Sequence, residues 1–296
     1  MPAHSPPRPG PPLADADAHL CVCAIARNET AYLLEWVAYQ RLLGADLVLI
    51  YDNGHDGEGT ALLHDLDQHG VITRVEWQGA FPHGPQVPAY DDALRRLSGR
   101  ADWVLFVDID EFVVPRQADS LPAFLKEVDE LDGVWFPWLI FGSSGQETHQ
   151  PAPVTERFLL REYVDDATVT PVKSVVRPHR TRGAHLHVHH VTTDAYANPL
   201  GERAFLTTAD GHRRSAQLAR GHDVVRVHHY MTKSRQEWRE KVARGRADRG
   251  FADVEPGRDL DEFPTWDRNE VYDDSALRFA PALRAEIRLL QRLVTR

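Results

Sequence analysis

The chain of 296 residues is 42% hydrophobic and 26% charged, an ordinary composition for a globular protein that buries one large core. Its formal charge of −10 at pH 7 disfavours nucleic acid as a partner, because non-specific phosphate binding needs a net basic surface. The two cysteines, Cys21 and Cys23, are too few for a disulfide framework, and we interpret both as reduced core residues.

The first 18 residues are rich in proline and lack the basic and apolar regions of a secretory signal. We therefore expect residues 1–18 to form a disordered tail. No stretch of the sequence approaches the roughly 20 apolar residues of a membrane-spanning helix. A cytoplasmic location is the resulting expectation.

From about residue 20 onward, short apolar strands alternate with helical segments, which predicts βαβ units and a mostly parallel central sheet flanked by helices. The predicted strands cover residues 20–25, 47–51, 71–77 and 103–107. The predicted helices run from Asn28 or Thr30, either of which can act as N-cap, to the stop at Gly44, and then over 60–69 and 88–97.

Beyond residue 121 the pattern predicts one more helix and a tryptophan-rich strand at 134–139, followed by irregular segments rich in Gly, Ser, His and Pro. Residues 274–296 predict one amphipathic, basic helix. Its arginines recur every four residues, at Arg284, Arg288, Arg292 and Arg296. Such a stripe usually faces solvent or a partner, and peripheral contact with an anionic membrane is the alternative.

Asp108, Asp110 and Glu111 directly follow an almost wholly apolar predicted strand. In open α/β sheets, ligands bind outside the carboxyl ends of the strands, so these acids are functional candidates. Alternation places Asp108 and Asp110 on one side, where a divalent cation with oxygen ligands would relieve their repulsion. Solvated acids or an arginine partner are the plainer interpretation. A phosphatase of the haloacid dehalogenase type is disfavoured, because three βα units precede the motif and Glu-Phe follows it.

Eight short blocks, taken in order, resemble the family 92 glycosyltransferases and their bacterial family 2-like relatives. They are CAIARNE at 23–29, YLLEW at 32–36, IYDN at 50–53, VDIDEF at 107–112, FGSSG at 141–145, ERF at 156–158, VKSVVRP at 172–178 and HYMTKS at 229–234. The order of the blocks makes this resemblance far more specific than any one of them.

The resemblance implies a GT-A (Rossmann-like) glycosyltransferase fold over residues 19–250, followed by a C-terminal helical extension at 251–296. Residues 19–112 would bind a nucleotide-diphosphate sugar, often the galactose derivative of uridine diphosphate, and residues 113–250 the acceptor. It also implies a diphosphate bridged by Mn²⁺ or Mg²⁺ and inversion at the anomeric carbon. Gln146 stands where the family usually has histidine, so the acceptor stays open: a glycan, lipid, protein or small molecule.

Candidates for donor binding follow the predicted strands. Ala26, Arg27, Asn28 and Glu29 would form the loop around the base, although Asn28 is equally a helix cap. Asp52 is placed to accept a hydrogen bond from uracil or ribose, with a plain turn residue as the alternative.

Further donor candidates come from one helix and from two of the blocks. Gln86 and Tyr90 lie four apart on one face of a predicted helix and could line the nucleotide pocket, although Tyr90 is equally a core residue. Lys173 and Lys233, with Arg177 as a further candidate, could neutralise phosphate.

For the metal, the resemblance implies Asp110 as a direct ligand, Asp108 as a ligand or ribose contact, and a later histidine, for which we choose His229. A buried structural histidine is the alternative. Zinc is disfavoured at a second histidine cluster, because residues two apart on a strand rarely converge on one ion. That cluster comprises His185, His187, His189 and His190.

Inverting transfer needs a base that accepts the proton of the attacking hydroxyl. We expect Glu156 or Glu147 to carry this role and prefer Glu156, which Arg157 could instead hold in an ion pair. Trp135 and Trp138 could stack on sugars but are equally typical of a core. The alternative function is a non-catalytic module that binds sugars or nucleotides, although such a module would not need to keep Asp108, Asp110 and His229.

Overall fold

The computed structural model describes residues 18–79, 81–185, 187, 189–191, 195–244 and 259–295. The predicted disordered tail lies outside the described residues except for Ala18. Residues 251–258 and Arg296 of the predicted extension lie outside them as well.

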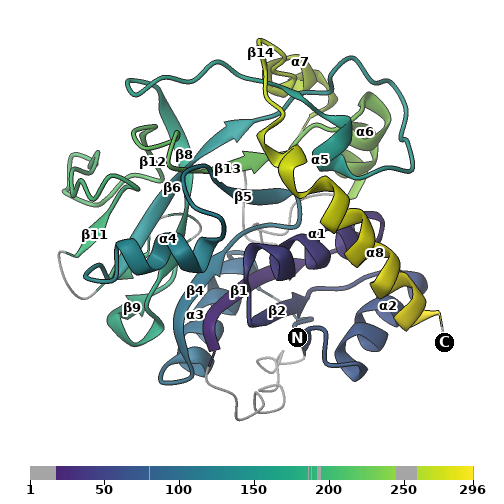
Figure 1. Cartoon of the computed structure of the whole chain (residues 1–296), viewed down its shortest axis with the longest axis horizontal. Helices are drawn as coiled ribbons and strands as arrows, with labels where there is room; N and C mark the ends of the chain where they lie inside the picture. Colours follow the sequence, from purple (N-terminus) through teal and green to yellow (C-terminus); the bar gives the residue numbers. More distant parts are fainter. Residues whose placement is uncertain are drawn as a thin grey trace.

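The first half of the chain forms the expected βα units (Figure 1). Strands β1 (Ala18–Ala26), β2 (Leu47–Asp52), β3 (Thr73–Glu76) and β4 (Ala101–Phe106) run parallel and alternate with helices α1 (Thr30–Leu43), α2 (Gly57–Gln68) and α3 (Gln86–Leu97). Strand β1 shows that the sheet is buried on both faces. Its alternating residues enter two separate cores, with Val22 in one and with Cys21 and Cys23, both free thiols, in the other.

The second half continues the same sheet. The strands of this half are β5 (Glu111–Pro115), β6 (Gly133–Ile140), β7 (Leu160–Arg161), β8 (Val169–Val176), β9 (Thr181–Gly183), β10 (His190–Val191), β11 (Tyr196–Ala197), β12 (Ala216–Leu218) and β13 (Val225–His229). Of these, β7, β9 and β10 lie outside the main sheet. The helices are α4 (Leu121–Glu127), α5 (Val154–Arg157), the 3-10 turn η1 (Pro178–Arg180) and α6 (Arg235–Arg244). Among the described residues, ten strands join one sheet, whose main path runs β3-β2-β1-β4-β8-β6-β13-β5.

Two of these strands correct the expectation that the chain beyond residue 139 is irregular. Strands β8 and β13 lie inside the sheet, and β8 runs antiparallel to both β4 and β6. Neither strand has a continuous apolar run, because each carries buried polar side chains such as Lys173 and His229. Charged residues of distant elements lie against these side chains, and the local pattern, which cannot show them, gave no strand signal.

The ends of α1 confirm one predicted cap and contradict another. Gly44 ends the helix in a left-handed conformation with φ of 104°, as expected. At the other end, the N-cap is Glu29, with no capping hydrogen bond from its side chain. Asn28 is instead tied through its backbone N–H to the carbonyl of Gly54, and the Thr30 hydroxyl donates to Asp56.

The C-terminal segment contains η2 (Leu260–Glu262), α7 (Phe263–Trp266), β14 (Val271–Tyr272), η3 (Ser275–Phe279) and α8 (Ala280–Val294). The single helix expected from residue 274 therefore begins with a 3-10 turn. Helix α8 packs along α1 and α2 (Figure 1), where Arg41 donates to Glu286.

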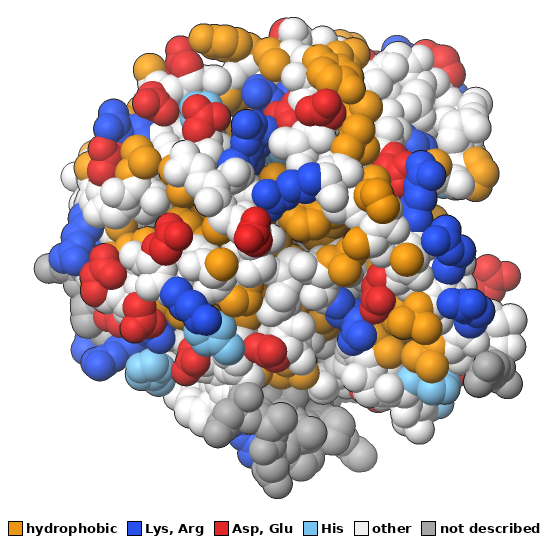
Figure 2. Space-filling view, in the orientation of Figure 1, with side chains coloured by type: hydrophobic (Ala, Val, Ile, Leu, Met, Phe, Trp, Pro, Cys, Tyr) orange, Lys and Arg blue, Asp and Glu red, His pale blue; other side chains and the backbone are white. Residues whose placement is uncertain are grey.

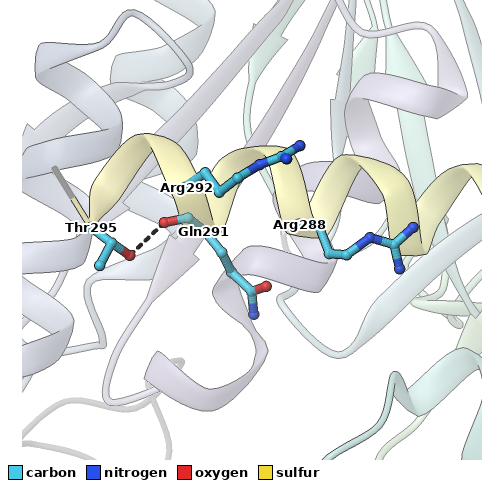
Figure 3. Close-up of a pocket in the computed structure, with 4 residues that line it drawn as sticks. All are labelled: Arg288, Gln291, Arg292 and Thr295. Atoms are coloured by element: carbon cyan, nitrogen blue, oxygen red, sulfur yellow. Dashed lines mark hydrogen bonds between the residues drawn. The ribbon is translucent and has the colours of Figure 1, made fainter.

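The outer face of α8 is basic, but its surroundings are mixed. Arg288 and Arg292 line a surface cavity of 410 Å³ together with Gln291 and Thr295 (Figure 3). Figure 2 shows Lys and Arg side chains interspersed with Asp and Glu over the face of the molecule that carries this helix. No helix in the part of the chain that the structure describes is long and apolar enough to cross a bilayer.

Candidate active site

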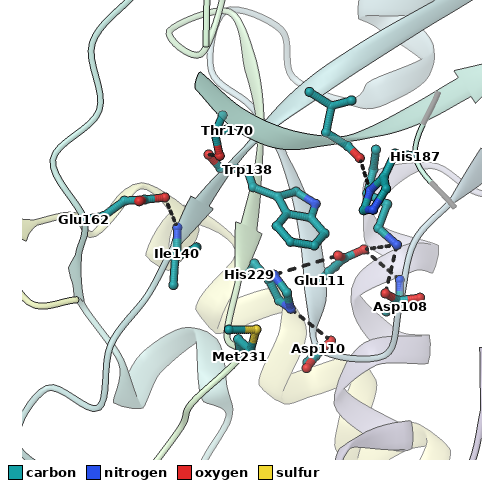
Figure 4. A network of polar contacts seen from close by, with 12 residues as sticks. Asp108, Asp110, Glu111, Trp138, Ile140, Glu162, Thr170, His187, His229 and Met231 are labelled. Carbon is teal, nitrogen blue, oxygen red and sulfur yellow. Dashed lines mark hydrogen bonds and ion pairs between the residues drawn. The ribbon is translucent and has the colours of Figure 1, made fainter. Parts of the chain in front are cut away.

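The acidic turn after β4 lies where the chain passes between two distant parts of the sheet. Strand β4 pairs with β1 and β8, whereas β5, which starts at Glu111, pairs with β13 at the far end of the sheet path. The turn is thereby brought against the middle of β8 and the end of β13, whose side chains lie beside it (Figure 4).

The Asp108 carboxylate is held by residues of two elements, α3 and β8. One of its oxygens accepts a hydrogen bond from Gln86 at 2.8 Å and a longer one from the Tyr90 hydroxyl at 3.4 Å. The other oxygen accepts from the Lys173 ammonium at 2.8 Å. Gln86 and Tyr90 also bond to each other at 2.9 Å, as their position on one helix face predicts. These contacts bring four of the predicted donor-site residues together.

Glu111 is fully buried behind Asp108. It accepts the backbone N–H of Asp108 at 2.8 Å and lies 3.3 Å from the Lys173 ammonium. Burial raises the pKa of Glu111 well above its ordinary value, and Lys173 opposes that shift. For Lys173, burial alone would lower the pKa, but Asp108 and Glu111 outweigh it and hold the ammonium charged.

Asp110 faces the opposite side of the turn, toward α6. Its carboxylate contacts the Lys241 ammonium directly, with the Lys233 ammonium at 3.9 Å and His229 Nε2 at 3.5 Å. Burial opposes ionisation of Asp110, but Lys241 and His229 outweigh it and hold its pKa well below the usual range.

The three carboxylates of the turn are thus matched by three lysine ammonium groups, those of Lys173, Lys233 and Lys241. Three neighbouring acids require positive charge beside them, which we expected a metal ion to supply. In the structure, lysines from β8, from the segment after β13 and from α6 supply it.

A divalent ion still fits between Asp110 and His229. The 3.5 Å between the Asp110 oxygen and His229 Nε2 would let one ion contact both atoms. On its other side, His229 Nδ1 lies 4.0 Å from a Glu111 oxygen, and both of these buried atoms lack a hydrogen bond among the described residues. A carboxylate behind the second ring nitrogen is the usual support of a metal-binding histidine.

The expected set of three protein ligands is not assembled. Among the described residues, no group of three or more His, Cys, Asp or Glu side chains could hold a metal ion. Asp108 is kept apart because its oxygens bond to Gln86, Tyr90 and Lys173. The same finding covers the described part of the second histidine cluster, in which His187 bonds to the carbonyl of Val172.

One of the two tryptophans belongs to the site. The Trp138 ring meets His229 edge-on, with 4.2 Å between ring centres, and lies over the Lys173 ammonium at 5.8 Å (Figure 4). Trp135 is buried in the core. Trp138 therefore contacts residues on both sides of the acidic turn, Lys173 beside Asp108 and His229 beside Asp110.

Among the remaining donor candidates, Asp52 is buried and occupied by its neighbours. Arg74 donates to one of its oxygens at 2.8 Å, and His55 and the backbone N–H of Gly54 contact the other. Burial raises the pKa of Asp52, but these bonds outweigh it and lower the pKa overall. Its predicted contact with uracil or ribose stays a prediction.

The loop after β1 contains one unusual residue. Ala26 ends the strand and is buried, whereas Arg27 and Asn28 are exposed and Glu29 is half-buried. Asn28 has a φ of 50°, a left-handed conformation that residues other than glycine seldom adopt. The structure keeps these residues beside the carboxyl end of β1, where a donor base was expected.

The two candidate bases lie in other surroundings. Glu156 forms an ion pair with Arg284 of α8, whereas Arg157, its expected partner, binds Glu237 instead. Glu147 is 73% exposed and lies 3.5 Å from Arg235. The structure therefore does not join either glutamate to the charged turn.

Arg177 also lies away from the turn. It donates to Asp129 and to the carbonyl of Leu131, and its guanidinium stacks over Trp103 near the start of β4. This is the opposite end of the strand from Asp108, so a phosphate bound at the turn would not reach it.

Lys241 was not among the predicted site residues, because helix α6 was not predicted. A signal was present. Ser234 and Glu237 form a capping box, in which the Glu237 carboxylate accepts the Ser234 N–H and the Ser234 hydroxyl accepts the Glu237 N–H. A helix that starts there places Lys241 one turn beyond Glu237 and near the first turn of α1.

A cavity of 290 Å³ opens beside this side of the site, between the start of α1 and α6. Its lining residues are Asn28, Thr30, Ala31, Tyr32, Asp56, Thr232, Lys233, Glu237, Glu240 and Lys241. Two of the three lysines of the site, Lys233 and Lys241, thus line this cavity.

The family model described as glycosyltransferase family 92 matches residues 16–248 of this chain. A glycosyltransferase family 92 protein of Ricinus communis is 31% identical over 106 residues, which cover 35% of this chain and 19% of that protein. A family 92 protein of Arabidopsis thaliana is 26% identical over 187 residues, which cover 58% of this chain and 31% of that protein. The chain spans less than a third of the length of these curated relatives.

Among solved structures, S. aureus TarS is similar with a TM-score of 0.34 and 16% identity, covering 54% of this chain and 28% of that chain. The structure of TarS residues 1–349 in complex with UDP gives a TM-score of 0.35 and 15% identity, covering 54% of this chain and 47% of that one.

Proposed function

Because the chain belongs to glycosyltransferase family 92, we propose that it transfers a sugar from a nucleotide-diphosphate sugar, with uridine diphosphate favoured, to an acceptor hydroxyl. The observation that carries the proposal is the buried turn of Asp108, Asp110 and Glu111, balanced by three lysines and flanked by His229. Such a dense arrangement of fixed charges suits a ligand that brings both a diphosphate and a counter-ion.

Asp110 and His229 would hold Mn²⁺ or Mg²⁺, with Glu111 behind the histidine ring. The bound ion would neutralise charge on the departing diphosphate. The pairing is compatible with the charge balance of the turn. A divalent cation together with a dianionic diphosphate would leave that balance unchanged.

The protein's own residues would orient the donor. Gln86, Tyr90 and Lys173 fix the Asp108 carboxylate, leaving it 34% exposed as a rigid acceptor for ribose hydroxyls. Lys233 would stabilise negative charge as the leaving group separates. Both effects act through groups that are already placed before the donor binds.

Inversion and a galactosyl donor remain proposals that rest on the family resemblance. We keep Glu156 and Glu147 as the proposed bases, and their surroundings make them separable by mutation. Glu156 is tied to α8 through Arg284, so its loss would affect stability, whereas the exposed Glu147 could be replaced with little structural cost. The acceptor, a cytoplasmic location and contact of α8 with a membrane stay proposals of the same kind.

A thermal-shift titration with uridine, guanosine and thymidine diphosphates, each with and without Mn²⁺, tests the donor site. We expect one nucleotide to raise the melting temperature only with the metal, and Asp110→Asn to abolish the effect. Asp102→Asn is the matched control, since Asp102 lies on β4 with its carboxylate 61% exposed and paired with His19.

The proposed donor site is overturned if none of the three nucleotides raises the melting temperature in a metal-dependent way. A nucleotide response without any sugar transfer to an acceptor panel would favour a non-catalytic binding module. Release of inorganic phosphate from small esters would favour a phosphatase.

A further inference from the structure

We propose that His187 is the catalytic base of the transfer, the group that takes the proton of the attacking acceptor hydroxyl. The inference deepens the proposed function and rests on it for the nature of the reaction. It competes with Glu156 and Glu147, which the structure does not join to the acidic turn, and one assay decides among the three. Three features of His187 carry it: its position beside the turn, the bonds that hold it and the lone pair on Nε2.

The first feature is the position of His187 at the carboxyl end of β4. Strand β4 pairs with β8 as far as Ser174. Continuing this antiparallel register by two residues places Val172 level with Asp108, and Nδ1 of His187 bonds to the Val172 carbonyl at 2.9 Å. The His187 ring also meets Trp138 edge-on, with 5.5 Å between ring centres (Figure 4). His187 therefore lies at the edge where open α/β sheets bind their ligands.

The second feature is the way in which β8 holds this residue. Besides the ring bond to Val172, the backbone carbonyl of His187 accepts a hydrogen bond from the Ser174 hydroxyl at 2.6 Å. Val172 and Ser174 flank Lys173 in the sequence, and the Lys173 ammonium bonds to Asp108. One strand thus fixes both the imidazole and the aspartate before any substrate binds, which is the precise placement that proton transfer requires.

The third feature is the tautomer that the bond to Val172 selects. A carbonyl oxygen can only accept, so Nδ1 of His187 carries the hydrogen of this bond. In the neutral ring the lone pair then lies on Nε2. In the described part of the chain no hydrogen bond engages Nε2, and the residue is only half-buried. His187 thus presents a proton acceptor to a hydroxyl that approaches the turn.

The surroundings of the ring keep it neutral and able to accept a proton. Burial and the Lys173 ammonium lower the pKa of His187 to about 4, and His185 on the same segment acts in the same direction. The bond to Val172 and the Asp108 carboxylate oppose this shift without cancelling it. The negative charge of a diphosphate bound at the turn would favour the imidazolium form. Binding of the donor would therefore make His187 more basic as transfer begins.

The transfer step balances around this residue. The acceptor oxygen attacks the anomeric carbon of the donor sugar and forms the new bond, while the bond from that carbon to the diphosphate oxygen breaks. The electron pair of the broken bond leaves with the nucleoside diphosphate, and the proton of the acceptor hydroxyl passes to His187 Nε2. The imidazolium afterwards releases this proton to solvent.

The test measures the release of UDP by the full chain with Mn²⁺ from UDP-galactose, UDP-glucose or UDP-N-acetylglucosamine. The acceptors are water and a panel of methyl glycosides. His187→Asn keeps an amide N–H in place of Nδ1–H for the Val172 carbonyl but removes the basic nitrogen, whereas His187→Ala leaves space for added imidazole. His179→Ala is the matched control, since His179 is exposed and lies just beyond the other end of β8.

We expect His187→Asn to lower the rate of UDP release by about 100-fold or more, as the loss of a positioned general base does. UDP binding and the melting temperature should stay near those of the unmodified protein, because the bond to Val172 is kept. Added imidazole should restore part of the rate to His187→Ala. A merely structural role for His187 would not give this rescue. The control His179→Ala should release UDP at the unmodified rate, with or without imidazole.

Two results would overturn the inference while the proposed function stands. One is an unchanged rate of UDP release in His187→Asn, whether or not Glu156→Gln or Glu147→Gln lowers it. The other is a loss in His187→Ala that imidazole does not restore and that accompanies weaker UDP binding, which would make His187 a structural tether. An unmodified protein that turns over none of the donors would overturn the proposed function and this inference together.

Discussion

Replacing Lys173 by methionine tests whether lysines hold the acidic turn together. Lys173 is 1% exposed, with its ammonium 2.8 Å from Asp108 and 3.3 Å from Glu111. Methionine preserves most of the side-chain volume but removes the charge, leaving two carboxylates without their buried partner.

The size of the effect follows from the exposure of each acid. The Asp108 side chain is 34% exposed, so water can partly replace Lys173 there, whereas Glu111 is fully buried and cannot be solvated. Removing one partner of a buried pair costs about 3–5 kcal/mol. We expect a loss of this size in the free energy of unfolding at neutral pH, a large share of the 5–15 kcal/mol or so that stabilises a typical domain.

The cost should shrink as the pH is lowered. Burial already raises the pKa of Glu111, and the loss of Lys173 removes the group that opposes that shift. When the pKa of a carboxyl group is higher in the folded state than in the unfolded state, the group favours folding at low pH. This contribution is lost as the pH rises from the unfolded-state pKa to the folded-state pKa. Protonation at low pH therefore relieves the uncompensated charge in the variant.

Urea unfolding followed by tryptophan fluorescence measures these energies in Lys173→Met, Glu111→Gln and the double variant. Removing Glu111 as well should recover part of the loss, giving a coupling of about 1–3 kcal/mol between the two residues. A Lys173→Met variant within about 1 kcal/mol of the unmodified protein, or strictly additive losses, would refute the reasoning.

Three further predictions concern elements around the site. Burial raises the pKa of Glu35 to about 7 against an ordinary 4.5, so stability should fall as pH rises between these values, and Glu35→Gln should flatten that dependence in urea unfolding. An unchanged pH dependence would contradict it. Asp273→Asn leaves the buried guanidinium of Arg226 without its carboxylate, so the free energy of unfolding in urea should fall by about 3–5 kcal/mol. A loss below about 1 kcal/mol would contradict this prediction. Gly44→Ala puts an alanine at a left-handed φ of 104° and places the new Cβ 2.8 Å from the ring of Pro122. The melting temperature of this variant should fall more than that of Gly70→Ala, where φ is 66° and no atom lies within 4 Å of the new Cβ. Equal losses in the two variants would exclude the clash.

The sequence alone determined the βα units, the stop at Gly44 and the position of the acidic turn at a strand end. These features follow from local rules, since hydrophobic period, cap residues and strand ends are visible within a short window. The predicted N-cap at Asn28 or Thr30 was wrong, because both residues bond to partners that are distant in sequence. The backbone N–H of Asn28 donates to the carbonyl of Gly54, and the Thr30 hydroxyl donates to Asp56.

Only the tertiary structure decided what neutralises the acids. Lys173 and Lys241 lie 65 and 131 positions from the aspartates that they contact, and no periodicity links residues so far apart. The sheet order brings them together, since β5 leaves β4 to pair with β13 and carries the turn against β8 and α6. Strands with buried charges, such as β8, are invisible to hydrophobic pattern because their stability comes from partners that only the folded chain supplies.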